Sequence, residues 1–506
     1  MPNPDDRLAR LRDHLAGAAH LAQAAALLSW DQVTHMPSGG AEARARQMAT
    51  LARAQHARWT APELEELVVA LETDGVDGAP LAGDDAALVR ETRRLLDRAR
   101  SMPADLVAAI SRQRVRGRQV WGQARADDDF ASFAPELRAM LALAREQASA
   151  IAPDAPAYDA LHDLYERGST AARVAALFDP LRDEVRALVV AIGASGVRPD
   201  AGILRREFPE AAQEAFAVAT VREMGYDFTR GRLDRTVHPF AIRIGAGDVR
   251  ITTRYRTDFL GSALFGTIHE AGHAMYEQNL PAQHVDTPLG GSVSLGIHES
   301  QSRLWENLVG RSPAFWERAY PRLQAAFPGV LDDVRSEAFV AAVNEVRPSL
   351  IRVEADEITY HLHVMLRFDL ERALLDGSLA VDDLPGAWRE RSRALLGIEP
   401  PNDREGCLQD VHWSQGMVGY FPTYSLGTLA SVQLWEAMAR DLGDLDEFLR
   451  EGRFAPLLGW LVEHVHAHGS RHEPEELLRR ATGAPLSSEP YLRYVRAKYG
   501  ALYRLA

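Results

Sequence analysis

The chain has 506 residues, and its 57 basic and 71 acidic side chains give a formal net charge of −14. Its composition, 46% hydrophobic and 25% charged, is typical of globular proteins and excludes collagen-like, disordered and coiled-coil chains. The negative charge argues against a nucleic-acid-binding protein, which would present a basic face.

Most of the chain has the apolar spacing of helices. Apolar residues recur at helical intervals in residues 8–28, 41–57, 84–100, 134–150 and 171–192. Ser169 and Thr170 precede the last of these segments as candidate N-cap residues. The pattern predicts a mainly α protein.

One region, residues 232–256, is rich in β-forming residues instead. Phe240, Ile242 and Ile244 alternate with less apolar residues, and the turn-forming segment 245–248 follows them. A second β-rich run then begins at Val249. We therefore expect a hairpin, and with it a small antiparallel sheet whose edge is able to hold an extended peptide.

A metal-binding motif follows the hairpin. The helix predicted between Asp258, its candidate N-cap, and Pro281 contains His269-Glu270-Ala271-Gly272-His273, an HExxH motif. Residues four apart lie on one helix face, so both imidazoles can bind one ion from the same side. Glu270 is then placed to act as general base on a water at the metal.

Three glycines occupy this one helix, at positions 261, 266 and 272. Each costs about 1 kcal/mol of helix stability relative to alanine. We therefore expect neighbouring elements to pack closely against the helix.

A catalytic zinc site needs a third protein ligand. Glu299, in the second predicted helix at 296–307, is the candidate that completes a His2Glu set. Glu277 and Glu306 compete with it, but we favour non-ligand roles for both. Asp356, Glu306 and Asp248 are all open as acceptors for the second ring nitrogens of the histidines.

These motifs resemble the carboxypeptidase Taq family (peptidase family M32) of thermostable metallocarboxypeptidases. The resemblance rests on the HEAGH and HESQSRLWEN segments and extends over essentially the whole chain. It also includes DVRIT at 248–252, IRVEADE at 351–357, GCLQDVHW at 406–413, GYFPTYSLG at 419–427, and segments at 29–41 and 491–503.

The resemblance implies a large, mainly α metallopeptidase with a deep central groove and a small sheet near the zinc helix. It implies one catalytic unit over residues 1–506, in which residues 1–230 form one groove wall. Residues 231–506 then carry the hairpin, the HExxH helix and the C-terminal helices. It also implies a homodimer.

The activity implied is metal-dependent release of single residues, with broad specificity, from peptides that have a free C-terminus. Zinc is the expected ion and cobalt the alternative. Two other functions stay open: an endo-acting zinc oligopeptidase, and a non-catalytic peptide-binding protein on the same fold.

The remaining site residues follow from the family's motifs. Arg352 is the residue implied to bind the substrate's terminal carboxylate, for which the planar guanidinium fork is suited. Its alternative is a surface ion pair with Glu354 or Asp356.

Catalysis also needs a donor to the oxyanion, for which Tyr424 is favoured and His238 is a further candidate. Tyr420, His412 and Arg250 are assigned to substrate binding. For either tyrosine the alternative is a buried packing role, and for His412 a core hydrogen bond to a backbone carbonyl.

The compartment is inferred from cysteine usage. The one cysteine, Cys407, excludes an internal disulfide, and an acidic chain without disulfides is typical of the cytoplasm. The N-terminal residues lack the pattern of a secretory signal. The longest apolar stretches are too short to span a bilayer, so no membrane partner is expected.

Overall fold

The computed structural model describes residues 4–76 and 79–505, which pack as two compact units. Unit 1 takes the described parts of 1–100, 200–343 and 434–485, and unit 2 takes those of 101–199, 344–433 and 486–506. Each unit is therefore built from three separate stretches of chain. The expected organisation as one catalytic unit, with parts that meet near residue 230, stays a prediction.

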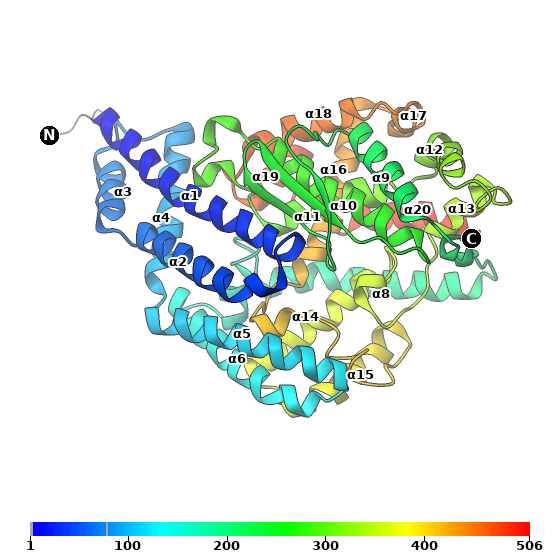
Figure 1. The fold of residues 1–506 in the computed structure, drawn as a ribbon, viewed down its shortest axis with the longest axis horizontal. Helices are drawn as coiled ribbons and strands as arrows, with labels where there is room; N and C mark the ends of the chain where they lie inside the picture. Colours follow the sequence, from blue (N-terminus) through cyan, green and yellow to red (C-terminus); the bar gives the residue numbers. More distant parts are fainter. Residues whose placement is uncertain (1–3, 77–78, 506) are drawn as a thin grey trace. The chain divides into compact units, whose positions relative to one another are not determined.

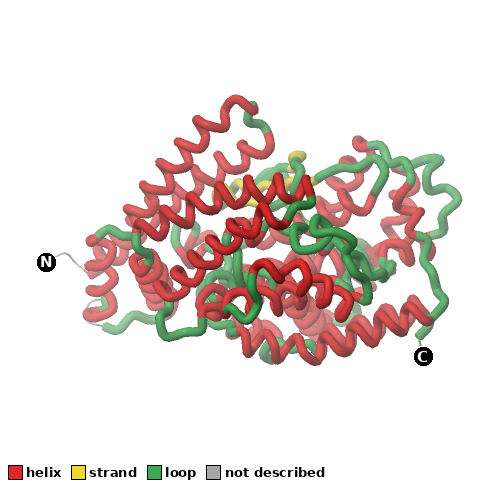
Figure 2. The backbone as a smooth tube through the Cα atoms, turned by 90° about the horizontal axis from the view of Figure 1, so that it is seen from below, coloured by secondary structure: helices red, strands yellow, loops and turns green. Residues whose placement is uncertain are grey.

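Helices make up most of both units, and strands occur in one small region (Figure 2). The helices of unit 1 are α1 (Pro4–Thr34), α2 (Ala41–Trp59), α3 (Pro62–Asp74), α4 (Gly83–Ser101), α9 (Glu210–Met224), α10 (Leu260–Gln278), α11 (Leu295–Arg303), α12 (Pro313–Ala326), α13 (Ser336–Val343), α17 (Leu445–Glu451), α18 (Ala455–His464) and α19 (Pro474–Thr482). Those of unit 2 are α5 (Ala104–Asp127), α6 (Phe130–Ile151), α7 (Ala157–His162), α8 (Ala171–Ala194), α14 (Tyr360–Asp376), α15 (Leu384–Leu396) and α20 (Glu489–Tyr503). The boundary at residues 433 and 434 falls inside α16 (Pro422–Leu442).

The five helical segments expected from apolar spacing are all present, as α1, α2, α4, α6 and α8. Each is longer than predicted by a few residues at one or both ends. Thr170 caps α8, because its hydroxyl accepts a hydrogen bond from the backbone N–H of Arg173 at 3.2 Å.

The sheet contains the predicted hairpin and one further strand. Strand β2 (Ala241–Gly245) pairs antiparallel with β3 (Asp248–Thr253), as expected. On its other side β3 pairs in parallel with β1 (Leu233–Arg235), so the sheet has the order β1-β3-β2. The expected antiparallel pairing is present in β2 and β3, and the parallel strand β1, which was not expected, makes the whole sheet mixed. Backbone bonds on both sides of the short β1 tie it to β3: Ile251 N–H donates to the carbonyl of Arg232 at 2.9 Å, and Thr236 N–H donates to the carbonyl of Thr253 at 3.0 Å.

Helix α10, which carries the HExxH motif, is the centre of unit 1. It packs against β3, α9 and α11 (Figure 1). Ala263, Ile268, Ala271 and Ala274 are all 0% exposed, so the helix is apolar on several faces, as a fully surrounded helix must be. The metal-site side chains therefore project from a rigid, buried element.

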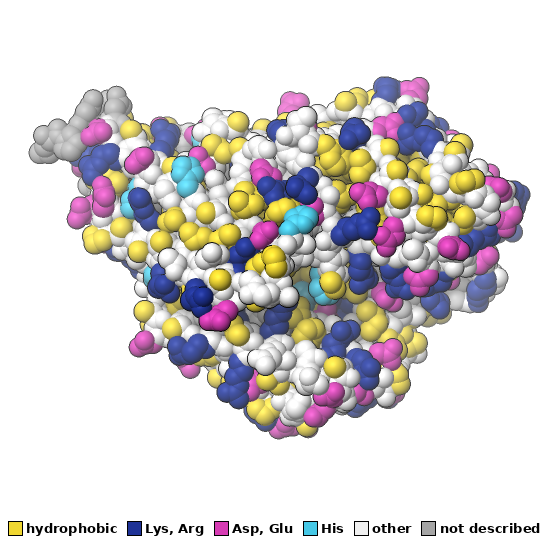
Figure 3. All heavy atoms as spheres, in the orientation of Figure 1, with side chains coloured by type: hydrophobic (Ala, Val, Ile, Leu, Met, Phe, Trp, Pro, Cys, Tyr) yellow, Lys and Arg dark blue, Asp and Glu magenta, His cyan; other side chains and the backbone are white. Residues whose placement is uncertain are grey.

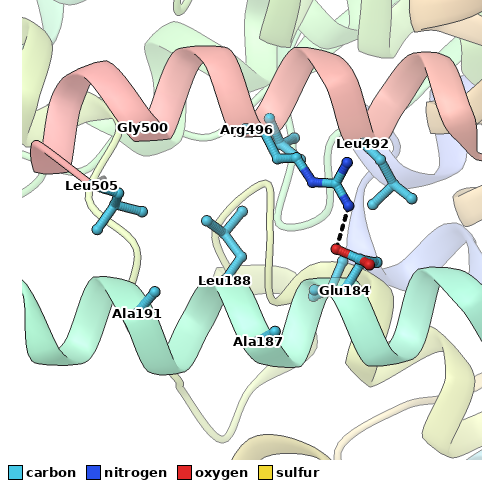
Figure 4. A pocket seen from close by; sticks show the side chains of 10 residues that line it. Glu184, Ala187, Leu188, Ala191, Leu492, Arg496, Gly500 and Leu505 are labelled. Atoms are coloured by element: carbon cyan, nitrogen blue, oxygen red, sulfur yellow. Dashed lines mark hydrogen bonds and ion pairs between the residues drawn. The ribbon is translucent and has the colours of Figure 1, made fainter.

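The core of unit 2 is built on α14, on which Leu362, Val364 and Met365 are fully buried. An apolar hollow of about 350 Å³ lies between α8 and α20, where Arg496 pairs with Glu184 at one end (Figure 4). None of the predicted site residues lines this hollow.

Basic and acidic side chains are interspersed over the face seen in Figure 3. Among the described helices, none is long and apolar enough to cross a membrane.

Candidate functional site

Three predicted ligands converge in unit 1. His269 and His273 lie one turn apart on α10 and both direct their Nε2 atoms at Glu299 of α11. The distances from these nitrogens to Oε2 of Glu299 are 3.7 Å for His269 and 3.5 Å for His273. One ligand atom from each residue lies within 4.8 Å of the others. In the described parts of the chain, no other group of histidine, cysteine and acidic residues meets this criterion.

Gly272 sets the spacing between α10 and α11. A Cβ atom at this position would lie 2.7 Å from Cα of Ser302 and 2.8 Å from the carbonyl oxygen of Gln301. The two backbones therefore approach more closely than any other residue at 272 would permit. The predicted close packing holds at this position, whereas a Cβ added at Gly266 would have no atom of another described element within 4 Å.

The start of α10 differs from the prediction, while α11 begins with a clear cap. Phe259 is the N-cap of α10, and the expected cap Asp258 binds the Arg256 guanidinium instead, at 2.9 and 3.0 Å. In α11 the Ser294 hydroxyl accepts the backbone N–H of Ile297 at 3.1 Å, which fixes the first turn of the helix that carries Glu299.

Glu306 holds the outer nitrogen of His269. It lies on the π-helical turn η5 (Leu304–Val309) that follows α11, and its Oε2 is 2.9 Å from Nδ1 of His269. Of the three carboxylates that the sequence left open as hydrogen-bond acceptors for the ligand histidines, Glu306 is thus the one that contacts a predicted ligand. Asp248 instead binds Arg250, and Asp356 binds Thr359.

His273 has a two-residue support that the sequence reasoning missed. Its Nδ1 lies 2.5 Å from Nδ1 of His298, and Nε2 of His298 is 2.9 Å from Oε1 of Glu277. The position of His298, directly before Glu299, was the only signal for it. Glu277 therefore takes a supporting role, in agreement with the prediction that it is not a ligand.

Arginines keep the carboxylates of the site ionised. Arg303 donates to Glu299 at 2.7 Å and to Glu306 at 3.1 Å, and Arg311 donates to Glu306 at 3.0 Å. Burial alone would raise the pKa of both glutamates, but Arg303 and the histidines hold each pKa well below its usual range.

The donor set fits a divalent metal ion. It offers one ionised carboxylate and two imidazole Nε2 atoms whose outer nitrogens are engaged by Glu306 and His298. Burial lowers the pKa of His273 to about 3, so this ring is neutral, as a metal ligand must be. Two histidines, one glutamate and supporting carboxylates are the usual composition of a catalytic zinc site.

Glu270 has the properties of a general base. It is 8% exposed, and burial raises its pKa to about 7. A carboxyl group with a pKa near the working pH can both accept and return a proton.

Arg352 lies in unit 2 on the 3-10 turn η6 (Arg352–Glu354) and is only 4% exposed. Its Nε and Nη2 donate to Oδ1 of Asp410 at 3.1 and 2.8 Å, and its Nη1 donates to the Tyr360 hydroxyl at 2.7 Å. The alternative of a surface pair with Glu354 or Asp356 is therefore wrong. Of its five N–H groups, two have no acceptor among the described residues.

An aromatic cluster surrounds this arginine. The Tyr424 ring centroid lies 4.9 Å from the guanidinium carbon of Arg352, and the Tyr424 hydroxyl is 3.3 Å from Nε2 of His412. The His412 ring contacts those of Tyr420 and Phe421 at 5.4 and 4.5 Å between centroids. The structure thus groups Arg352, Tyr420, Tyr424 and His412, and the hydrogen-bond partner of the His412 ring is the Tyr424 hydroxyl and not the backbone carbonyl considered as its alternative.

The two other candidates, His238 and Arg250, both belong to unit 1. His238 is exposed on the loop between β1 and β2. Arg250 binds Asp248 and stacks 4.1 Å from the Trp30 ring centroid. Within the described part of unit 1, neither forms a hydrogen bond or ion pair with the metal-site residues. Their assigned roles stay predictions.

An HExxH helix, a carboxylate ligand from the following helix and a buried glutamate next to the first histidine define a metallopeptidase. Residues 10–499 match the family model of the carboxypeptidase Taq (M32) metallopeptidases. The chain belongs to this family and is a metallocarboxypeptidase.

Relatives in sequence and structure extend over nearly the full chain. The chain is 46% identical to thermostable carboxypeptidase 1 of Thermus thermophilus, over 99% of both proteins. It is 38% identical to carboxypeptidase 1 of Bacillus subtilis, over 97% of this chain and 98% of that protein. The crystal structure of an M32 carboxypeptidase from Deinococcus radiodurans matches with a TM-score of 0.96 and 42% identity, over 99% of this chain and 100% of that one.

Proposed function

We propose that the protein removes single residues from the free C-terminus of peptides, with broad side-chain specificity and with zinc as its ion. The observation that carries the proposal is the convergence of His269, His273 and Glu299 next to the buried Glu270. Cobalt is the alternative ion, because a His2Glu set accepts several divalent metals.

The proposed chemistry divides between the ion and Glu270. When bound, a divalent ion supplies Lewis-acid polarisation of the scissile carbonyl and acidifies water. Glu270 takes a proton from the attacking water and gives it to the leaving amine. A pKa of about 7 suits both transfers, because neither protonation state of the carboxyl group is then strongly disfavoured.

Recognition of the terminal carboxylate is assigned to Arg352. The two N–H groups of Arg352 that have no acceptor among the described residues suit the two oxygens of a terminal carboxylate. The Tyr424 hydroxyl is proposed as donor to the oxyanion, with His238 as the alternative. Tyr420, His412 and Arg250 are proposed to contact the substrate.

The proposal includes a cytoplasmic homodimer. Cys407 is a buried free cysteine, which is in keeping with a reducing compartment. The dimer rests on the family resemblance.

A time course by mass spectrometry tests the activity. An unstructured peptide is supplied as the free acid and as the C-terminal amide, with and without a chelator. We expect stepwise loss of residues from the free acid only, abolished by the chelator and restored by zinc or cobalt. Internal fragments from both peptides would instead identify an endo-acting oligopeptidase. Absence of cleavage by fully metal-loaded protein would identify a binding protein.

A further inference from the structure

One carboxylate in unit 2 is shared by two buried arginines. Asp410 accepts from Arg352 on Oδ1, at 2.8 Å from Nη2, and from Arg367 on Oδ2, at 2.6 Å from Nε. Arg352 lies on η6, Arg367 on α14, and Asp410 shortly before the turn η8 (His412–Gln415). Three separate segments of unit 2 thus meet at one carboxyl group.

Arg367 is held in one orientation and has no exposure to solvent. Its side chain is 0% exposed, its Nη1 donates to the carbonyl of His363 at 2.8 Å, and its guanidinium carbon lies 4.7 Å from the Trp388 ring centroid. A fully buried charge is expensive, and a pair of apolar residues would usually be as stable. Its presence therefore calls for a reason beyond packing.

The group carries an excess positive charge, because two guanidinium groups share one carboxylate. Neighbouring titratable side chains do not cancel it. Burial lowers the pKa of His363 and of His412 to about 3, which leaves both neutral, and burial raises the pKa of Glu371 to about 8, which leaves it mostly protonated near pH 7. The excess charge remains with the guanidinium groups.

We infer that Arg367 is a positioning residue for carboxylate recognition: it occupies the second oxygen of Asp410, so that the charge of Arg352 stays uncompensated and available to the substrate. The inference rests on the proposed role of Arg352. It adds that the selectivity for free C-termini depends on a guanidinium that touches neither the substrate nor the metal.

Without Arg367, Arg352 and Asp410 would form a closed, neutral pair, and Oδ2 of Asp410 would be an unpaired negative atom near the incoming carboxylate. Both changes oppose binding of an anion, and they are strong because the group is shielded from water. Binding of an uncharged terminus would be little affected.

Three variants separate charge balance from packing. Arg367→Met keeps most of the side-chain volume and removes the charge. The double variant Arg367→Met with Asp410→Asn removes one charge of each sign, so Arg352 again carries the only net charge, and the amide oxygen introduced at position 410 can still accept from it. Asp410→Asn alone raises the net charge of the group. Thermal unfolding and metal content show whether each variant is folded.

The readout is competitive inhibition by a pair of matched ligands, N-benzoyl-phenylalanine and its amide, with the metal-loaded enzyme. We expect Arg367→Met to raise the inhibition constant of the acid about tenfold or more, with that of the amide unchanged. In the double variant, the inhibition constant of the acid should return to within about threefold of the wild-type value. Asp410→Asn alone should favour the acid over the amide at least as strongly as the wild type.

A folded Arg367→Met enzyme with unchanged discrimination between acid and amide would overturn the inference, as would a folded double variant without recovery. Should Arg367→Met not fold, Asp410→Asn decides, because equal weakening of both ligands contradicts the charge argument. Arg352→Met is tested separately. If that variant still discriminates, then the proposed role of Arg352 has failed, and not merely the role of Arg367.

Discussion

The contact at Gly272 allows a prediction in which stability and metal binding change together. In Gly272→Ala the new Cβ would lie 2.7 Å from Cα of Ser302, against about 3.4 Å for an ordinary contact, so α10 and α11 must separate by about 0.7 Å. Both atoms that the Cβ meets belong to backbone, so no side chain can rotate away. Overpacking of this kind costs about 1–3 kcal/mol, against which better helix propensity returns about 1 kcal/mol.

The same shift moves Glu299 relative to the histidines. A displacement of this size spoils ligand geometry, and we expect metal affinity to fall about 10- to 100-fold, as for the loss of a supporting contact. Affinity is measured by competition with a chromophoric chelator, and stability by urea unfolding of the metal-free protein.

Gly266→Ala is the matched control, because it lies on the same helix and its new Cβ would have no atom of another described element within 4 Å. It should gain up to about 1 kcal/mol and leave metal affinity unchanged. If the two variants behave alike, the close approach of α10 and α11 does not constrain the site and the reasoning is refuted.

Three further predictions concern single carboxyl groups. Glu270→Gln should bind metal normally but lose at least about 100-fold in kcat, since it removes the general base; near-normal turnover would exclude Glu270 from the mechanism. Glu306→Gln should weaken metal binding about 10- to 100-fold, measured by chelator competition, because His269 loses its carboxylate partner. For Glu371 burial raises the pKa to about 8, so the folded protein holds a proton that the unfolded chain releases above about pH 4.5. The free energy of unfolding should thus fall as the pH rises from about 4.5 to about 8, by up to about 1.4 kcal/mol per pH unit. In Glu371→Gln, the free energy of unfolding, measured with urea, should fall less steeply with pH. An equal pH dependence in both proteins would contradict the raised pKa.

The parts of the fold predicted well from sequence are those set by local patterns. The helices α1, α2, α4, α6 and α8 follow from apolar spacing, and the β2–β3 hairpin from alternation and turn residues. Strand β1 was missed because three residues carry no pattern of their own, and their pairing is supplied entirely by β3. The prediction of Asp258 as the N-cap of α10 was wrong because the guanidinium of Arg256, two residues earlier, binds the Asp258 carboxylate.

The candidate site divides in the same way. His269, Glu270 and His273 are a local motif, and Glu299 was reached through the chemistry that a third ligand requires. The partner of Arg352 is 58 residues away in sequence, at Asp410, so nearby acidic residues were considered in its place. His298 and Arg367 were missed because a polar residue reveals its role only through the partners that tertiary structure brings to it.

The position of His298 directly before Glu299 has a consequence for how the ion leaves the protein. A single turn of α11 supplies one ligand and also the support of a ligand on another helix, through the contact between His298 and His273. Partial detachment of α11 would therefore free Glu299 and His273 in one event. Release of the ion and local opening of α11 should then share one rate, which amide hydrogen exchange of the α11 backbone can measure alongside transfer of the ion to a chelator.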